Sequence, residues 1–168
     1  ENAELIERSV AYLVKDGKRV IFDAEHFFDG YKKSSSFALN MLEAAQKGGA
    51  DTLVLCDTNG GSLPEFISQA TEDVVRKFDQ KIGIHAHNDS GLAAANTLIS
   101  VVAGVSHVQG TINGVGERCG NANLGTIIPN LLLKMNYETI TQIELQNLTA
   151  LNHFVYGIMN LHPDDQAP

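Results

Sequence analysis

The sequence predicts an α/β fold in which four consecutive strand–helix units build a parallel sheet. Apolar strand segments begin near Val20, Thr52, Ile82 and His107, and each leads into a polar, glycine-bearing turn and then a helical pattern. Alternating strands and helices are typical of parallel sheets with right-handed crossovers. The units average about 30 residues, the size of one unit of a (β/α)8 barrel of about 250 residues. We therefore expect four of the eight units of such a barrel.

A small doubly wound sheet is the alternative architecture. No Gly-x-Gly-x-x-Gly motif opens the first helix, so the dinucleotide site of that fold has no support. Both architectures keep their chemistry where strands end and loops begin, and the polar residues of this chain collect there.

The helices are predicted from apolar residues that recur every three or four positions. An incoming helix, residues 3–13, precedes the first strand. Ser62 with Glu65 forms a capping-box pattern, and Asp89 is the expected N-cap before Gly91. Three later helices carry the apolar stripes Ile67/Ala70/Val74/Phe78, Leu92/Ala95/Leu98/Val102 and Leu124/Ile127/Leu131/Met135.

The pattern changes after Asn136. Two further helical stretches, residues 139–145 and 148–160, precede a tail rich in Pro and Asp that resembles a linker. We expect residues 1–137 to form half of a TIM-barrel catalytic domain and residues 138–168 to form a helical linker toward a C-terminal subdomain.

Composition limits the possible partners and location. The apolar and charged fractions, 43% and 19%, are those of an ordinary globular protein. A net charge of −8 provides no attraction for nucleic acid or an anionic membrane, so neither is an expected partner. Two cysteines, Cys56 and Cys119, make no disulfide framework, which favours a reducing, cytoplasmic location. Both thiols are expected to be inert.

His85 and His87 end the third strand, and residues two apart on a strand face the same way. Two adjacent imidazoles at a strand end are a natural pair of ligands for a divalent metal. The alternative is a pair of hydrogen-bonded histidines at a barrel mouth.

The fourth strand runs into a glycine-rich loop, residues 114–123. Asn121 precedes a helix, so it is either an N-cap or a neutral oxygen ligand beside the two histidines. Glu117 and Arg118 form either an exposed loop ion pair or a support that holds Asn121 in place.

Thr58 and Glu25 end the second and first strands on the inward face. The Thr58 hydroxyl suits a substrate carboxylate, although the segment 57–61 also fits a turn in which Asp57 or Asn59 bonds its own backbone. Glu25 suits work as a substrate contact or base, and the alternative is a solvated charge at the rim.

Five segments in this order carry a family resemblance. They are DAEHFFDG (23–30), LCDTNGG (55–61), GIHAHND (83–89), QGTING (109–114) and GERCGN (116–121). Together they strongly resemble the citramalate synthase branch of the 2-isopropylmalate/homocitrate/citramalate synthase family, over nearly the whole chain. The resemblance implies that the four units are the second half of a (β/α)8 barrel.

The resemblance also implies a divalent cation (Mg, Mn, Co or Zn) held by an Asp, two His and an Asn. His85, His87 and Asn121 match three of these ligands, whereas the Asp lies on the first barrel strand and has no counterpart here. Thr58 matches the residue that binds the keto acid carboxylate. Glu25 matches a glutamate near the keto acid and the acetyl-CoA methyl group, and Glu117 matches one that positions the ligand asparagine.

The implied activity is a metal-assisted, Claisen-type condensation of acetyl-CoA with a 2-keto acid. Pyruvate, giving citramalate, is the expected substrate, with 2-isopropylmalate or homocitrate synthesis as alternatives. The resemblance implies a homodimer of the full-length enzyme and a base histidine outside this chain, so the isolated segment is expected to be inactive. The lyase relatives carry a Gly-x-Gly-Gly-Cys loop where this chain has Gly-Val-Gly-Glu-Arg, which disfavours a lyase. A different class of function, a non-catalytic half-barrel that binds metal or a partner, also fits the sequence.

Overall fold

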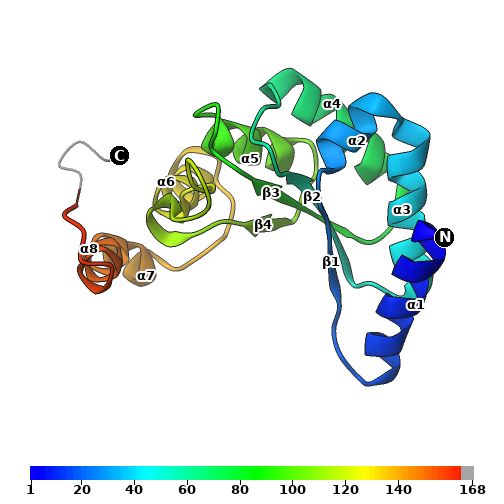
Figure 1. Cartoon of the computed structure of the whole chain (residues 1–168). Coiled ribbons are helices and arrows are strands. Elements are labelled where there is room, and N and C mark those ends of the chain that lie inside the picture. The colour runs from blue at the N-terminus through cyan, green and yellow to red at the C-terminus, as the bar shows by residue number, and fades with distance from the viewer. Residues whose placement is uncertain (164–168) are drawn as a thin grey trace.

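A four-stranded parallel sheet organises the molecule (Figure 1). The computed structural model describes residues 1–163. The strands are β1 Ile21–Ala24, β2 Thr52–Asp57, β3 Lys81–Ala86 and β4 His107–Gln109, and they pair in the order β1-β2-β3-β4. A doubly wound sheet reverses its strand order at a switch point, whereas a barrel keeps the strands in sequence. The observed order therefore confirms four successive units of the barrel type.

The helices lie along the outer side of the curved sheet, and α7 and α8 lie beyond β4 (Figure 1). The crossover from β1 to β2 contains two helices where the sequence predicted one, because Ser34 accepts a hydrogen bond from the Phe37 nitrogen and starts a new helix. The helices are α1 Asn2–Lys15, α2 Phe27–Lys33, α3 Ser35–Gly48, α4 Pro64–Lys77, α5 Ala93–Val102, α6 Leu124–Pro129, α7 Gln142–Gln146 and α8 Leu148–Ile158. Short helical turns, η1 Ile112–Gly114 and η2 Asn130–Lys134, flank α6.

The main hydrophobic core lies between the outer face of the sheet and the helices. Leu53 and Leu55 of β2 and Ile84 of β3 are fully buried there, against Ile67 and Val74 of α4. The alternate residues Val54 and Cys56 are also buried, on the inner face. A side-chain period of two therefore fixes which β2 residues pack outward and which face the barrel interior.

The predicted buried stripe of α5 is wrong. Val102 is 62% exposed. The face that packs inward instead carries small and polar residues. Two of their hydroxyls are satisfied within the helix: Thr97 donates to the Ala93 carbonyl and Ser100 to the Asn96 carbonyl. Such small side chains let the helix approach its neighbours closely. The buried residues are Ala93, Asn96, Thr97, Ser100 and Val101.

The predicted capping box of α4 is also wrong. Helix α4 starts after Leu63, and the Ser62 hydroxyl donates to the buried Asp57 carboxylate at 3.0 Å. Asp57 thereby orders the turn that follows β2.

One further predicted cap is wrong, and one alternative that the sequence left open is not the one observed. Asn88, and not Asp89, accepts a hydrogen bond from the first turn of α5, through the Ala93 nitrogen at 3.2 Å. Asn123, and not Asn121, caps α6 by accepting from the Gly125 nitrogen at 2.8 Å. Asp89 and Asn121 are thereby available for other contacts.

The C-terminal helices lie against the loop that follows β4. The Asn113 side chain donates to the Asn152 carbonyl of α8 at 2.9 Å. The division into a half-barrel and a linker stays a prediction, and part of the Pro/Asp tail lies outside the described residues. Within residues 1–163, no helix has the length and apolar character needed to cross a membrane.

Candidate active site

The loop after β4 folds back along the end of β3 and brings Asn121 beside the two histidines. The Asn88 nitrogen donates to the Gly120 carbonyl, and the Ala122 nitrogen donates to the Ala86 carbonyl, each at 2.9 Å. These bonds pair His87 with Asn121 in an antiparallel bridge. Gly120 has φ +91, a conformation that favours glycine, and a Cβ there would collide with the Gly114 carbonyl.

His85 and Asn121 face each other across this site. Nε2 of His85 lies 3.1 Å from Oδ1 of Asn121, and Nδ1 of His85 lies 2.7 Å from Oε1 of Gln109. The Gln109 amide in turn donates to the Asp23 carboxylate at 2.9 Å. The half-buried imidazole of His85 is thus contacted at both ring nitrogens.

His87 lies next to His85, with ring centroids 5.2 Å apart. Only 8% of His87 is exposed, and its Nδ1 atom is buried with no hydrogen-bond partner among the described residues. Burial, the charge of His85 and the charge of Arg118 lower the pKa of His87 below its usual value. The neutral form therefore dominates near pH 7, which leaves a ring lone pair free to bind a cation.

This donor set fits a divalent cation, although it is incomplete. Two imidazoles and one amide oxygen converge, and both kinds of atom bind divalent metals. Residues 1–163 contain no group of three or more His, Cys, Asp or Glu side chains arranged to hold a metal. The structure therefore brings together His85, His87 and Asn121 as predicted, without the carboxylate ligand that the resemblance implies.

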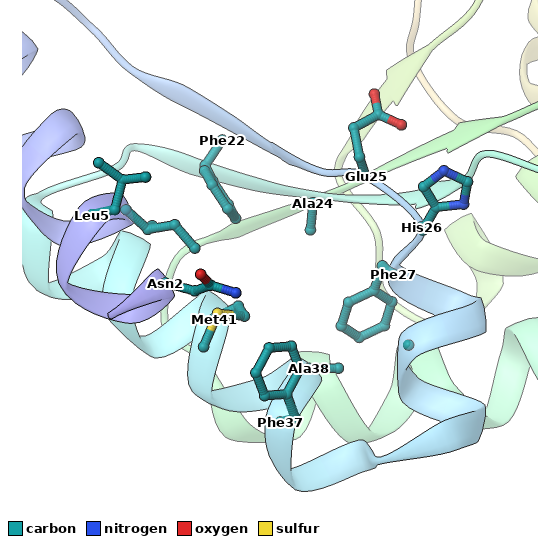
Figure 2. Close-up of a pocket in the computed structure, with 12 residues that line it drawn as sticks. Asn2, Leu5, Phe22, Ala24, Glu25, His26, Phe27, Phe37, Ala38 and Met41 are labelled. Carbon is teal, nitrogen blue, oxygen red and sulfur yellow. The ribbon is translucent and has the colours of Figure 1, made fainter.

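Thr58 and Glu25 lie together at the ends of β2 and β1. The Thr58 hydroxyl donates to the Glu25 carboxylate at 2.7 Å and accepts from the His26 nitrogen at 2.7 Å. Figure 2 shows the Glu25 carboxylate turned away from a pocket between β1 and helices α1 and α3. Because that pocket is mainly apolar and on the outer side of the strand, we assign it to packing and not to the polar site. Its apolar lining includes Leu5, Phe22, Ala24, Phe37 and Met41.

Arg118 joins three loops of the site, a role that the sequence did not predict. Its guanidinium donates to both carboxylate oxygens of Asp89, at 2.7 and 3.0 Å, and to the Thr58 carbonyl at 2.6 Å. Arg118 has φ +56, an uncommon conformation for a residue other than glycine. The loops after β2, β3 and β4 are therefore tied at one point.

Glu117 is not brought to the histidines. Its side chain is 81% exposed, and its carboxylate lies 3.8 Å from Arg118. This arrangement matches the exposed loop ion pair, which is one of the two alternatives that the sequence left open. The role of Glu117 in positioning Asn121 stays a prediction.

Sequence reasoning did not identify Gln109 as a site residue. The available signal was strand register: Gln109 pairs with His85, so the two side chains share the inward face of neighbouring strands. Cys56 lies on the same inward face, where burial and the charges of Glu25 and Asp23 raise the pKa of its thiol. That thiol stays protonated, in agreement with an inert residue.

Four parallel βα units with polar side chains at the carboxyl ends of the strands define the chain as part of a barrel-type α/β domain. The chain belongs to the HMGL-like family, whose profile matches residues 1–155.

Comparisons with known proteins agree with this assignment. The chain is 56% identical to an (R)-citramalate synthase of Aquifex aeolicus over 96% of its own length and 31% of the relative. It is 33% identical to a probable 2-isopropylmalate synthase of Methanosarcina acetivorans over 90% of its length and 30% of the relative. The chain thus spans about a third of the curated relatives it matches.

The solved structure of a Bacillus subtilis HMG-CoA lyase superimposes on 98% of this chain and on 57% of its own, with a TM-score of 0.79. The identity is 21%, so this likeness supports the TIM-barrel fold alone.

Proposed function

We propose that the protein to which these residues belong condenses acetyl-CoA with a 2-keto acid, and that the keto acid is pyruvate, giving citramalate. The observation that carries this proposal is the convergence of His85, His87 and Asn121 at the carboxyl ends of the strands, in a chain 56% identical to a citramalate synthase. The weaker similarity to 2-isopropylmalate synthase, at 33% identity, favours pyruvate over larger keto acids.

His85, His87 and Asn121 are the proposed ligands of a divalent cation. When bound, such a cation chelates the keto acid and polarises its carbonyl as a Lewis acid. Thr58 is the proposed donor to the keto acid carboxylate, and Glu25 lies beside it to contact the keto acid and the acetyl methyl group. Glu117 supports the asparagine loop. The base that removes the methyl proton is assigned to a histidine outside this chain.

A homodimeric assembly and a cytoplasmic location belong to the same proposal. They rest on the resemblance and on the cysteine content, and both are testable on the full-length protein.

The test of the function is substrate profiling of the full-length protein with pyruvate, 2-oxoisovalerate and 2-oxoglutarate, measured by release of CoA. Pyruvate should give the highest kcat/KM. Faster turnover of 2-oxoisovalerate would reassign the protein to 2-isopropylmalate synthesis.

The test of the metal site uses His85→Ala and His87→Ala, with His153→Ala on the exposed surface of α8 as the control. Both site variants should lose calorimetric binding of Mn²⁺ and nearly all activity, and the control should retain them. Normal metal binding by both site variants would contradict the ligand assignment.

A further inference from the structure

The hydrogen bonds around His85 have a defined direction. An ionised carboxylate such as Asp23 only accepts hydrogen bonds, so the amide group that meets it at 2.9 Å is the NH2 of Gln109. The Gln109 oxygen then faces His85 Nδ1 at 2.7 Å, and this oxygen also only accepts. Nδ1 of His85 therefore carries a proton, and in the neutral imidazole Nε2 carries a lone pair.

The amide of Asn121 has a defined direction too. Its NH2 group donates to the Val115 carbonyl at 3.3 Å, which turns Oδ1 toward His85. In the neutral ring, Oδ1 of Asn121 and Nε2 of His85 thus lie 3.1 Å apart with no proton between them. Two lone pairs directed at each other repel, and a cation that binds both atoms relieves this repulsion.

We propose that Asp23 and Gln109 are positioning residues that hold His85 in the Nδ1–H tautomer, so that its Nε2 lone pair is available to the cation beside Asn121. The inference rests on the proposed function in one respect, the identity of the bound group as a divalent cation. Asp23 and Gln109 act through His85 and do not contact the substrate in this assignment.

The opposite tautomer is disfavoured by the same contacts. It requires the Gln109 amide to rotate by 180°, which places the amide oxygen against the Asp23 carboxylate and breaks a charge-assisted hydrogen bond. It also places an Nε2 proton between His85 and Asn121, where the cation should bind. Asp23, on β1, thereby controls a ligand on β3 through a residue on β4.

The first experiment measures Mn²⁺ affinity of the full-length protein by calorimetry in Gln109→Met. Loss of a partner that orients a ligating histidine typically weakens metal binding about 10–100-fold, and we expect an effect of this size. Gln46→Met is the matched control, because Gln46 is another half-buried glutamine, whose amide donates a 2.6 Å bond to Gln80 away from the site. Unchanged affinity in Gln109→Met, or an equal loss in Gln46→Met, overturns the inference.

The second experiment restores the contact in reversed form. In the double variant Asp23→Asn/Gln109→Glu, the new amide donates to the new carboxylate, which still accepts from His85 Nδ1. The affinity of the double variant for Mn²⁺ should return to within a few-fold of the wild type. Gln109→Glu alone places two carboxylates against each other, and its affinity should differ from those of the wild type and the double variant. If the double variant binds Mn²⁺ as weakly as Gln109→Met does, the inference is overturned. This isosteric pair also provides the test if Gln109→Met does not fold.

The third experiment needs no metal. Solid-state 13C and 15N spectra of histidine-labelled, metal-free protein distinguish the two tautomers, and His85→Gln assigns the signal. We expect the Nδ1–H form in the wild type and a loss of this preference in Gln109→Met. An Nε2–H form in the wild type overturns the inference. If the wild type binds no metal while His85 holds the Nδ1–H form, the proposed function fails. The positioning of His85 by Asp23 and Gln109 would then still stand.

Discussion

The Thr58 hydroxyl lies 2.7 Å from the Glu25 carboxylate and donates its single proton to it. The two residues, which the sequence placed on different strands with separate roles, therefore form one unit. A substrate carboxylate that binds to Thr58 must replace Glu25 as the acceptor of this proton. Under the proposed function, binding of the keto acid at Thr58 would therefore be coupled to release of the Glu25 side chain.

Thr58→Val should raise KM for the keto acid by about 10–100-fold, because a hydrogen bond to a charged group contributes about 1.5–3 kcal/mol. KM for acetyl-CoA should change far less. Thr58→Ser keeps the hydroxyl and should remain close to the wild type. Steady-state kinetics with each substrate varied in turn measure the effect, and equal changes for both substrates would rule out the proposed contact.

Arg118→Met should reduce kcat/KM at least about 10-fold with little loss of thermal stability. Exposed ion pairs contribute only about 0–1 kcal/mol to folding, but this one orders three loops around the site. Arg118→Lys should have an intermediate effect, since an ammonium group cannot make the paired contacts of a guanidinium.

Arg19→Met is the matched control for Arg118. Arg19 contacts Asp51 at 2.8 and 3.0 Å and is exposed, near the opposite ends of the strands. Its loss should leave kcat/KM unchanged. A similar loss of activity in the two variants would show that Arg118 has no specific role in the mouth of the barrel.

The strands were predictable because β2 and β3 are nearly continuous apolar runs, and because parallel strands end at one edge of a sheet. The shared location of His85, His87 and Thr58 follows from this rule, because all three lie at the carboxyl ends of strands. The helix α5 was not predictable in detail, since its buried Thr97 and Ser100 satisfy their hydroxyls within the helix and read as surface residues in the sequence.

The contacts that complete the site depend on long-range geometry. Gln109 meets Asp23 across 86 positions of the chain, and Arg118 meets Thr58 across 60. Neither pair belongs to a local pattern, so periodicity gives no signal for them. The left-handed backbone of Arg118, by contrast, is a local feature that residue type alone did not indicate.

Tyr31 should titrate near pH 12, later than an ordinary tyrosine with a pKa of about 10. Its hydroxyl donates to Asp73 at 2.8 Å, and burial together with this carboxylate raises the pKa of Tyr31 to about 12. A raised folded pKa means that the stabilisation is fully present below about pH 10 and is lost as the pH rises toward 12.

The difference in ultraviolet absorbance titration between wild type and Tyr31→Phe measures this directly. The variant should lose a late-titrating component and about 1 kcal/mol of stability at neutral pH, the value of a typical hydrogen bond. Tyr12→Phe, at a tyrosine that is 74% exposed, should lose neither. A Tyr31 that titrates near pH 10 would contradict the half-buried contact with Asp73.

The last prediction concerns these 168 residues expressed alone. Among the described residues, β1 pairs only with β2 and β4 only with β3, so each outer strand keeps an edge of unpaired backbone groups. Such edges recruit other chains unless they are covered. The carboxylate ligand and the base histidine of the proposed mechanism are also absent, and catalytic groups that act as a unit do not lose activity in proportion to the number removed. We therefore expect no release of CoA from acetyl-CoA and pyruvate with added Mn²⁺, and self-association in light scattering. A stable monomer with turnover like that of the full-length protein would show that the four units form a complete catalytic fold by themselves.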